Sequence, residues 1–196
     1  MIPNRNGYFA LLLCMLCSLP LAAQEAPMRY GYRVLATSRT GTMEKEMNEA
    51  ADAGFVFGGV MGGQTAFGGK EVLVIMKKNT SATGPTSRKY KLLATSRTGT
   101  MQKELQQAGD EGFVYCGLTV FESAFGGHEV SVILERDPAT PAVRIEYKLL
   151  ATSRTGTMQK ELQQAGDEGF VFRGVAIGKT KMGGAEVVTV LERPAK

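Results

Sequence analysis

The chain has 196 residues, of which 43% are hydrophobic and 21% charged, and its formal net charge is +4. This composition is that of a globular protein. No lysine or arginine run forms the clustered basic face that nucleic-acid binding needs, so no nucleic-acid partner is expected.

Residues 1–23 have the pattern of a secretory signal peptide. Arg5 gives the start a positive charge, residues 8–21 are almost wholly apolar, and Ala22 and Ala23 precede a polar segment. We expect cleavage after Ala23 and export of a secreted or periplasmic protein, with no stable membrane insertion after cleavage. The alternative is an uncleaved membrane anchor, although the apolar run is shorter than the roughly 20 residues that span a bilayer.

Cleavage would also change the charge and the cysteine content. Loss of Arg5 lowers the net charge from +4 to +3, and loss of Cys14 and Cys17 leaves only Cys116. An intrachain disulfide is then impossible, and the mature protein must rely on its apolar core. Cys116 is expected to be a small buried apolar residue in a strand.

Three similar segments make up the rest of the chain. They span residues 32–78, 90–136 and 147–193, and linkers at 79–89 and 137–146 join them. Repeats two and three are identical at 25 of their first 25 positions but at only 8 of the next 22. Duplication alone should have spared both halves alike. Either structure or a ligand constrains the first half, or exchange at the DNA level homogenised it.

The first half of each repeat predicts a strand and then a helix. In repeat one, residues 32–37 are rich in β-formers, a polar turn follows, and Thr42 can cap the helix with its hydroxyl. Gly54 stands where a left-handed C-terminal cap prefers glycine. Apolar residues recur at helical spacing, namely Met43, Met47, Ala50 and Ala51.

The second half predicts two strands paired as an antiparallel hairpin. In repeat one they cover residues 55–60 and 71–76, with a glycine-rich connection between them. The last strand is apolar at every position from Val72 to Met76, as is typical of a strand covered on both faces. The expected hairpin glycines are Gly68, Gly69, Gly126, Gly127, Gly183 and Gly184.

These elements predict an α+β fold of three tandem β-α-β-β repeats after the signal peptide. One helix can cover only one face of a three-stranded sheet, and a repeat of 47 residues is close to the lower limit for independent folding. We therefore expect the sheets to pack together with the helices outside, in a pseudo-threefold arrangement. Repeats that fold as independent beads are the alternative.

The repeats also carry a short recurrent pattern. In repeat two it consists of Tyr90-Lys91, Leu105, Gly109, Glu111-Gly112-Phe113 and Glu135-Arg136. The pattern resembles the small bacterial domain-of-unknown-function family 4177, although that family has Trp where Phe113 stands and lacks the Thr-Ser-Arg-Thr-Gly-Thr loop. The resemblance implies the β-α-β-β topology and no particular activity.

That loop is the candidate ligand site. Hydroxyls, a guanidinium group and the free N–H groups of a helix N-terminus are what a phosphate, sulfate or carboxylate would use. The structural alternative is that Arg39 and its equivalents pair with acids of a neighbouring repeat, for which Glu71, Glu129 and Glu186 are candidates. The candidate residues are Ser38, Arg39, Thr40, Thr42, Ser96, Arg97, Thr98, Thr100, Ser153, Arg154, Thr155 and Thr157.

No catalytic residue, metal site or cofactor is predicted. His128 is the single histidine, which excludes a repeated histidine metal site and favours an exposed turn residue. No nucleophile and base recur together. The sequence therefore favours a non-catalytic exported binding or structural module, whose partner is a small anion or another exported protein. The alternative is a protein that binds or processes a small anionic ligand at the repeated loops.

Overall fold

The computed structural model describes residues 28–64, 70–81, 88–122, 128–179 and 185–195. The predicted signal peptide and the hairpin glycines lie outside these residues. In the part that is described, no helix has the length and apolar character needed to cross a membrane.

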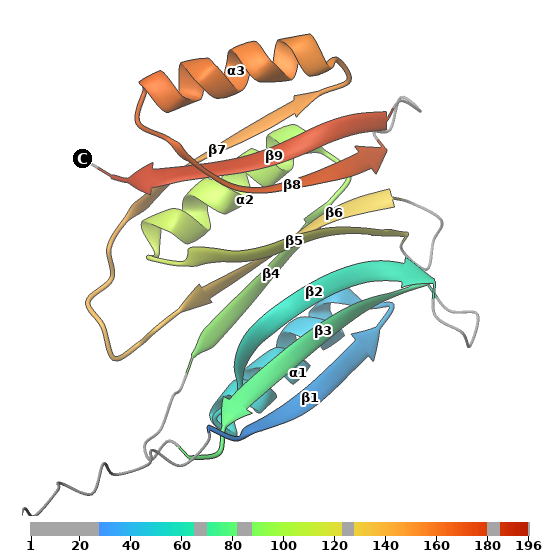
Figure 1. Cartoon of the computed structure of the whole chain (residues 1–196), viewed down its shortest axis with the longest axis vertical. Helices are drawn as coiled ribbons and strands as arrows, with labels where there is room; N and C mark the ends of the chain where they lie inside the picture. Colours follow the sequence, from blue (N-terminus) through green and yellow to red (C-terminus); the bar gives the residue numbers. More distant parts are fainter. Residues whose placement is uncertain (1–27, 65–69, 82–87, 123–127, 180–184, 196) are drawn as a thin grey trace, which may run out of the picture.

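The described residues fold as three β-α-β-β segments, each with its own antiparallel sheet (Figure 1). In each sheet the last strand lies in the centre, in the order β1-β3-β2, β4-β6-β5 and β7-β9-β8. The α+β class, the three repeats and the antiparallel hairpins are therefore as predicted. The elements are β1 (Tyr30–Thr37), α1 (Thr40–Asp52), β2 (Val56–Gln64), β3 (Lys70–Asn79), β4 (Lys89–Thr95), α2 (Thr98–Asp110), β5 (Val114–Glu122), β6 (His128–Arg136), β7 (Ile145–Thr152), α3 (Thr155–Asp167), β8 (Val171–Lys179) and β9 (Ala185–Pro194).

The apolar central strand of repeat two is covered on both faces, as its sequence predicts. Val132 and Leu134 of β6 are fully buried in one cluster with Met101 and Leu105 of α2. Ile133, which alternation places on the other face, is also fully buried, but in a cluster with core residues of repeat one. Repeat one therefore covers the second face of β6.

The expected pseudo-threefold arrangement is wrong, because the three repeats follow one another in a row (Figure 1). One core cluster joins repeat one to repeat two, and the other joins repeat two to repeat three. The sheet of repeat one lies at one end of the row and α3 at the other. The packing has a direction: repeat one covers one face of the sheet of repeat two, and repeat two covers the same face of repeat three. Among the described residues, no repeat covers this face of repeat one, and repeat three covers no further repeat.

The helices are also not simply outside. α1 contacts β4 of the next repeat as well as its own strands β1 and β3, and α2 contacts β7 as well as β4. The first two helices thus lie between consecutive repeats. We call the contact between repeats one and two the first joint, and the contact between repeats two and three the second joint. α3 contacts β7 of its own repeat and ends the row.

Each helix begins three residues earlier than predicted. α1 starts at Thr40 with Arg39 as its N-cap residue, and no side chain caps it. The backbone N–H of Arg39 instead donates to the hydroxyl of Thr37, at 3.2 Å. This short-range bond ends the strand, so Thr42 lies inside the first turn and does not cap the helix. At the other end the prediction is confirmed, since Gly54 has a φ of 86° just after the helix.

Candidate functional site: the strand-to-helix loops and the joints between repeats

The three strand-to-helix loops have the same local geometry. The N–H groups of Arg97 and Arg154 donate to Thr95 and Thr152 at 3.1 and 3.2 Å, as Arg39 does to Thr37. The loops differ in exposure. Ser38, Arg39, Thr42, Arg97 and all four candidate residues of repeat three (Ser153, Arg154, Thr155 and Thr157) are exposed, whereas Thr40, Ser96, Thr98 and Thr100 are half-buried.

The loop arginines form no ion pair with any residue that the structure describes. No salt bridge to Arg39, Arg97 or Arg154 occurs there, and pairing with Glu71, Glu129 or Glu186 therefore does not explain them. Among the described residues, no group of three or more acidic, histidine or cysteine side chains could hold a metal ion.

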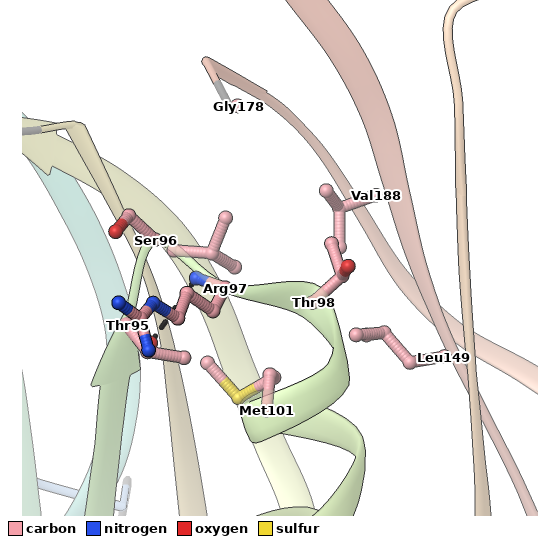
Figure 2. A pocket seen from close by; sticks show the side chains of 9 residues that line it. Thr95, Ser96, Arg97, Thr98, Met101, Leu149, Gly178 and Val188 are labelled. Carbon is pink, nitrogen blue, oxygen red and sulfur yellow. Dashed lines mark hydrogen bonds between the residues drawn. The ribbon is translucent and has the colours of Figure 1, made fainter. Parts of the chain in front are cut away.

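A small, partly open pocket lies beside the second loop (Figure 2). Its lining combines the loop with apolar side chains of α2, β6 and repeat three: Thr95, Ser96, Arg97, Thr98, Met101, Val130, Leu149, Gly178 and Val188. Figure 2 shows the Arg97 guanidinium group on the side away from Leu149 and Val188. The pocket is therefore mainly an apolar gap between repeats two and three, with loop hydroxyls at its rim.

The glycines of the three loops are not required by close packing in the described chain. Gly41, Gly99 and Gly156 lie in the first helical turn, and a Cβ built on any of them would meet nothing within 4 Å. Glycine in a helix costs about 0.5–1 kcal/mol relative to alanine. Packing within the described chain does not require this cost.

The joints between repeats are built on polar side chains of α1 and α2. Asn48 receives a bond from the Tyr90 N–H at 3.0 Å and donates to the Tyr90 carbonyl at 2.9 Å. Glu44 accepts from the Leu92 N–H at 2.8 Å. β4 is an edge strand of its sheet. The helix of repeat one therefore satisfies backbone groups that an edge strand otherwise leaves unpaired.

The second joint repeats this chemistry with glutamines. Gln106 receives a bond from the Tyr147 N–H at 3.1 Å and donates to the Ile145 carbonyl at 3.2 Å. Gln102 donates to the Tyr147 carbonyl at 2.8 Å and accepts from the Leu149 N–H at 2.7 Å. α1 and α2 thus each bind the edge strand of the next repeat through hydrogen bonds to its backbone, as a neighbouring strand would.

An apolar contact accompanies each polar one. A Cβ built on Gly117 of β5 would stand 2.9 Å from the Phe57 ring and 2.9 Å from a Val60 methyl group, both on β2. At the next joint, Gly174 of β8 faces the hydroxyl of Tyr115 in the same close way. A glycine in the second strand of each later repeat therefore admits the side chains of the repeat before it.

Tyrosine hydroxyls extend the joints into the sheets. The Tyr90 hydroxyl accepts from the Phe57 N–H at 2.7 Å, and the Tyr147 hydroxyl donates to the Phe113 carbonyl at 3.0 Å. Burial, together with nearby carboxylates, raises the pKa of both tyrosines well above the usual range. Burial also raises the pKa of Tyr115 to about 12 and that of the Cys116 thiol well above its usual value. Cys116 is a half-buried free thiol in a strand and is poorly suited to act as a nucleophile.

The recurrent pattern of the repeats forms a structural clip. Lys91 lies 4.7 Å from the centre of the Phe113 ring and forms an ion pair with Glu111 at 2.6 Å. Lys148 makes the same pair of contacts with Phe170 and Glu168 in repeat three. The Glu168 pKa is held below its usual value by this lysine. These contacts tie the ends of α2 and α3 to the first strands of their own repeats.

At the two ends of the row, residues equivalent to those buried in the joints are exposed. Tyr32 is 67% exposed, whereas its equivalents Tyr90 and Tyr147 are 3% and 4% exposed. Val34 is 59% exposed, against 9% for Leu92. At the other end the strand β8 exposes the apolar side chains of Val171, Phe172, Val175 and Ile177.

Searches against family models, curated proteins and solved structures found no match to this chain. The sequence interpretation concentrated on the loops and missed the joints. A signal for them was present, because polar side chains recur at one pair of helix positions, Glu44 and Asn48 in repeat one and Gln102 and Gln106 in repeat two.

Proposed function

We propose that this protein is an exported, non-catalytic binding or structural module whose binding surfaces are the two ends of the row. The observation that carries the proposal is the exposure of Tyr32 and Val34 at positions that are buried in the later repeats. A strand edge with unpaired backbone groups and exposed apolar side chains is a ready template for another polypeptide.

The proposal combines this geometry with the sequence. Export follows from the signal-peptide pattern of residues 1–23. The resemblance of the repeats to family 4177 is part of the proposal as well, and it adds no activity. The binding role rests on the ends, since the joints inside the chain are already occupied.

Photo-crosslinking in cells that produce the protein tests this function. A photo-reactive amino acid is placed at Val34, at Ile177 or, as a matched exposed control, at Lys103 in α2. We expect adducts to form from the two end positions and none from the control. If neither end position gives an adduct, or if all three positions crosslink equally, the ends are not binding surfaces.

A second candidate is anion binding at the loops. It is supported by Gly41, Gly99 and Gly156, whose open first-turn positions would let an anion approach the backbone N–H groups. Phosphate or sulfate should then raise the melting temperature of the protein. Replacing Arg39, Arg97 and Arg154 together by Ala should remove that effect without unfolding the protein. If the parent protein shows no stabilisation by either anion, this candidate is wrong.

A further inference from the structure

Repeat one and repeat three end the row with surfaces that correspond to the two sides of the internal joints. The head surface is defined here as Tyr32 and Val34 of β1 with Gly59 and Met61 of β2. The tail surface is defined as Gln159 and Gln163 of α3 with Phe172, Val175 and Ile177 of β8.

The polar half of the tail surface copies that of α2. α3 has the same thirteen-residue sequence as α2, and Gln159 and Gln163 stand where Gln102 and Gln106 grip β7. Gln159 and Gln163 are both exposed. Within the described residues the side chain of Gln163 forms a hydrogen bond only with Asp167 of its own helix, to which it donates at 3.0 Å. Gln102 and Gln106 bind an edge strand at the second joint. Their equivalents Gln159 and Gln163 have no such strand beside them in the described chain.

The polar half of the head surface is the matching edge. Tyr32 and Val34 occupy the places of Tyr90 and Leu92, whose backbone N–H groups are held by α1 at the first joint. β1 is an edge strand of its sheet, as β4 is of the next. The head surface thus offers an edge strand like the one that Gln102 and Gln106, the equivalents of the tail glutamines, bind at the second joint.

The apolar halves also correspond. Phe172 and Val175, which are 50% and 54% exposed, occupy the places of Phe57 and Val60. Those two side chains pack on Gly117, whereas the equivalent glycine of repeat one, Gly59, has nothing within 4 Å of a built Cβ. The tail therefore carries the side chains, and the head carries the open glycine that would receive them.

We propose that a second copy of this chain occupies each end, with the tail surface of one copy docked on the head surface of the next. The inference rests on the proposed function and names its partner. The two ends lie at opposite ends of the row in Figure 1, so one copy cannot satisfy itself. The contact is heterologous and continues the internal joint, and it gives an open chain of copies or a closed ring according to the rotation per repeat.

Mixing two blocked variants tests this proposal. The head-blocked variant is Gly59→Glu, at a position with open space, and Tyr32→Glu is an independent version of it. The tail-blocked variant is Phe172→Glu combined with Gln163→Ala, both at exposed positions. All variants are made in the exported form of the protein, and their folding is checked by circular dichroism and thermal melting.

Sedimentation velocity then measures association. The parent protein should sediment faster as its concentration rises, and each blocked variant should remain a monomer. An equimolar mixture of a head-blocked and a tail-blocked variant should form a one-to-one dimer and nothing larger, because each contributes one intact surface.

Three results would overturn the proposal: a parent protein that stays monomeric up to about 1 mM, a mixture that stays monomeric while the parent associates, or a single blocked variant that still forms dimers. Its failure can be distinguished from failure of the proposed function. If the parent is monomeric but the crosslinker at Val34 captures a different protein, the ends bind a partner other than a second copy. If the parent is monomeric and neither end crosslinks, both are wrong.

Discussion

Gly109 and Gly166 occupy the same place in two helices of identical sequence, and alanine at these two positions should have opposite effects on stability. A Cβ at Gly109 would overlap the carbonyl oxygen of Ile145 and stand 2.9 Å from Cδ2 of Tyr147, both in β7. A Cβ at Gly166 would meet nothing within 4 Å. The comparison therefore isolates the packing of α2 against the next repeat.

The magnitudes follow from two opposing effects. Alanine in place of glycine stabilises a helix by about 0.5–1 kcal/mol, and this gain applies at both positions. Overpacking costs about 1–3 kcal/mol, and the upper part of that range applies at Gly109 because the obstacle is backbone. Gly109→Ala should lower the free energy of unfolding by about 1–2 kcal/mol, and Gly166→Ala should raise it by about 0.5–1 kcal/mol.

Urea-induced equilibrium unfolding measures both changes, at a low protein concentration where copies do not associate. Ala51 takes this position in α1 and is buried, so the restriction belongs to the second joint and not to the helix as such. Equal changes in the two variants would refute the reasoning, because they would show that α2 does not rest on β7 as described.

Three further predictions concern the joints and the core. Asn48→Ala should lower the free energy of unfolding by about 1–3 kcal/mol, because it leaves the Tyr90 N–H and carbonyl groups unpaired at a buried edge. The matched variant in α3, Gln163→Ala, should change the free energy of unfolding of the monomer by less than about 0.5 kcal/mol. Urea titrations measure both changes. The free energy of unfolding should fall as the pH rises from 10 towards about 12, since burial raises the pKa of Tyr115 to about 12 in the folded chain while the unfolded chain ionises near 10.0; stability that stays constant across this window, measured by urea unfolding at each pH, would contradict it. A fragment of residues 88–137 should lack a cooperative thermal transition in calorimetry, because repeat one buries both Ile133 and Tyr90. A sharp independent transition would show that a single repeat suffices.

Local patterns in the sequence were sufficient to predict the elements of each repeat. The apolar spacing of Met43 and Met47 predicted the buried face of α1, because helical geometry puts side chains four apart on one side. Gly54 marked the end of the helix because its φ of 86° is costly for other residues. The prediction for Thr42 failed because Thr37 bonds the Arg39 N–H and starts the helix earlier, a competition that sequence alone does not rank.

The candidate loops, too, could be predicted from the sequence only in part. Their hydroxyls, arginines and glycines could be read directly, and the structure places them at helix N-termini as expected. The pocket beside Ser96 could not be predicted, since Leu149, Gly178 and Val188 of repeat three complete its lining. The sites predicted as three equivalent copies are therefore in three different environments.

The amino-acid sequence was enough to predict three repeats, each with a strand, a helix and a hairpin, and a last strand that is covered on both faces. That the repeats cover one another in one direction along a row became evident only in the folded structure. The reason is physical: the covering contacts join Asn48 and Phe57 of one repeat to Tyr90 and Gly117 of the next, at separations of 42 and 60 residues along the chain. No local periodicity records such pairings, and they leave Tyr32 at one end and Gln163 at the other without partners from a neighbouring repeat in the described chain.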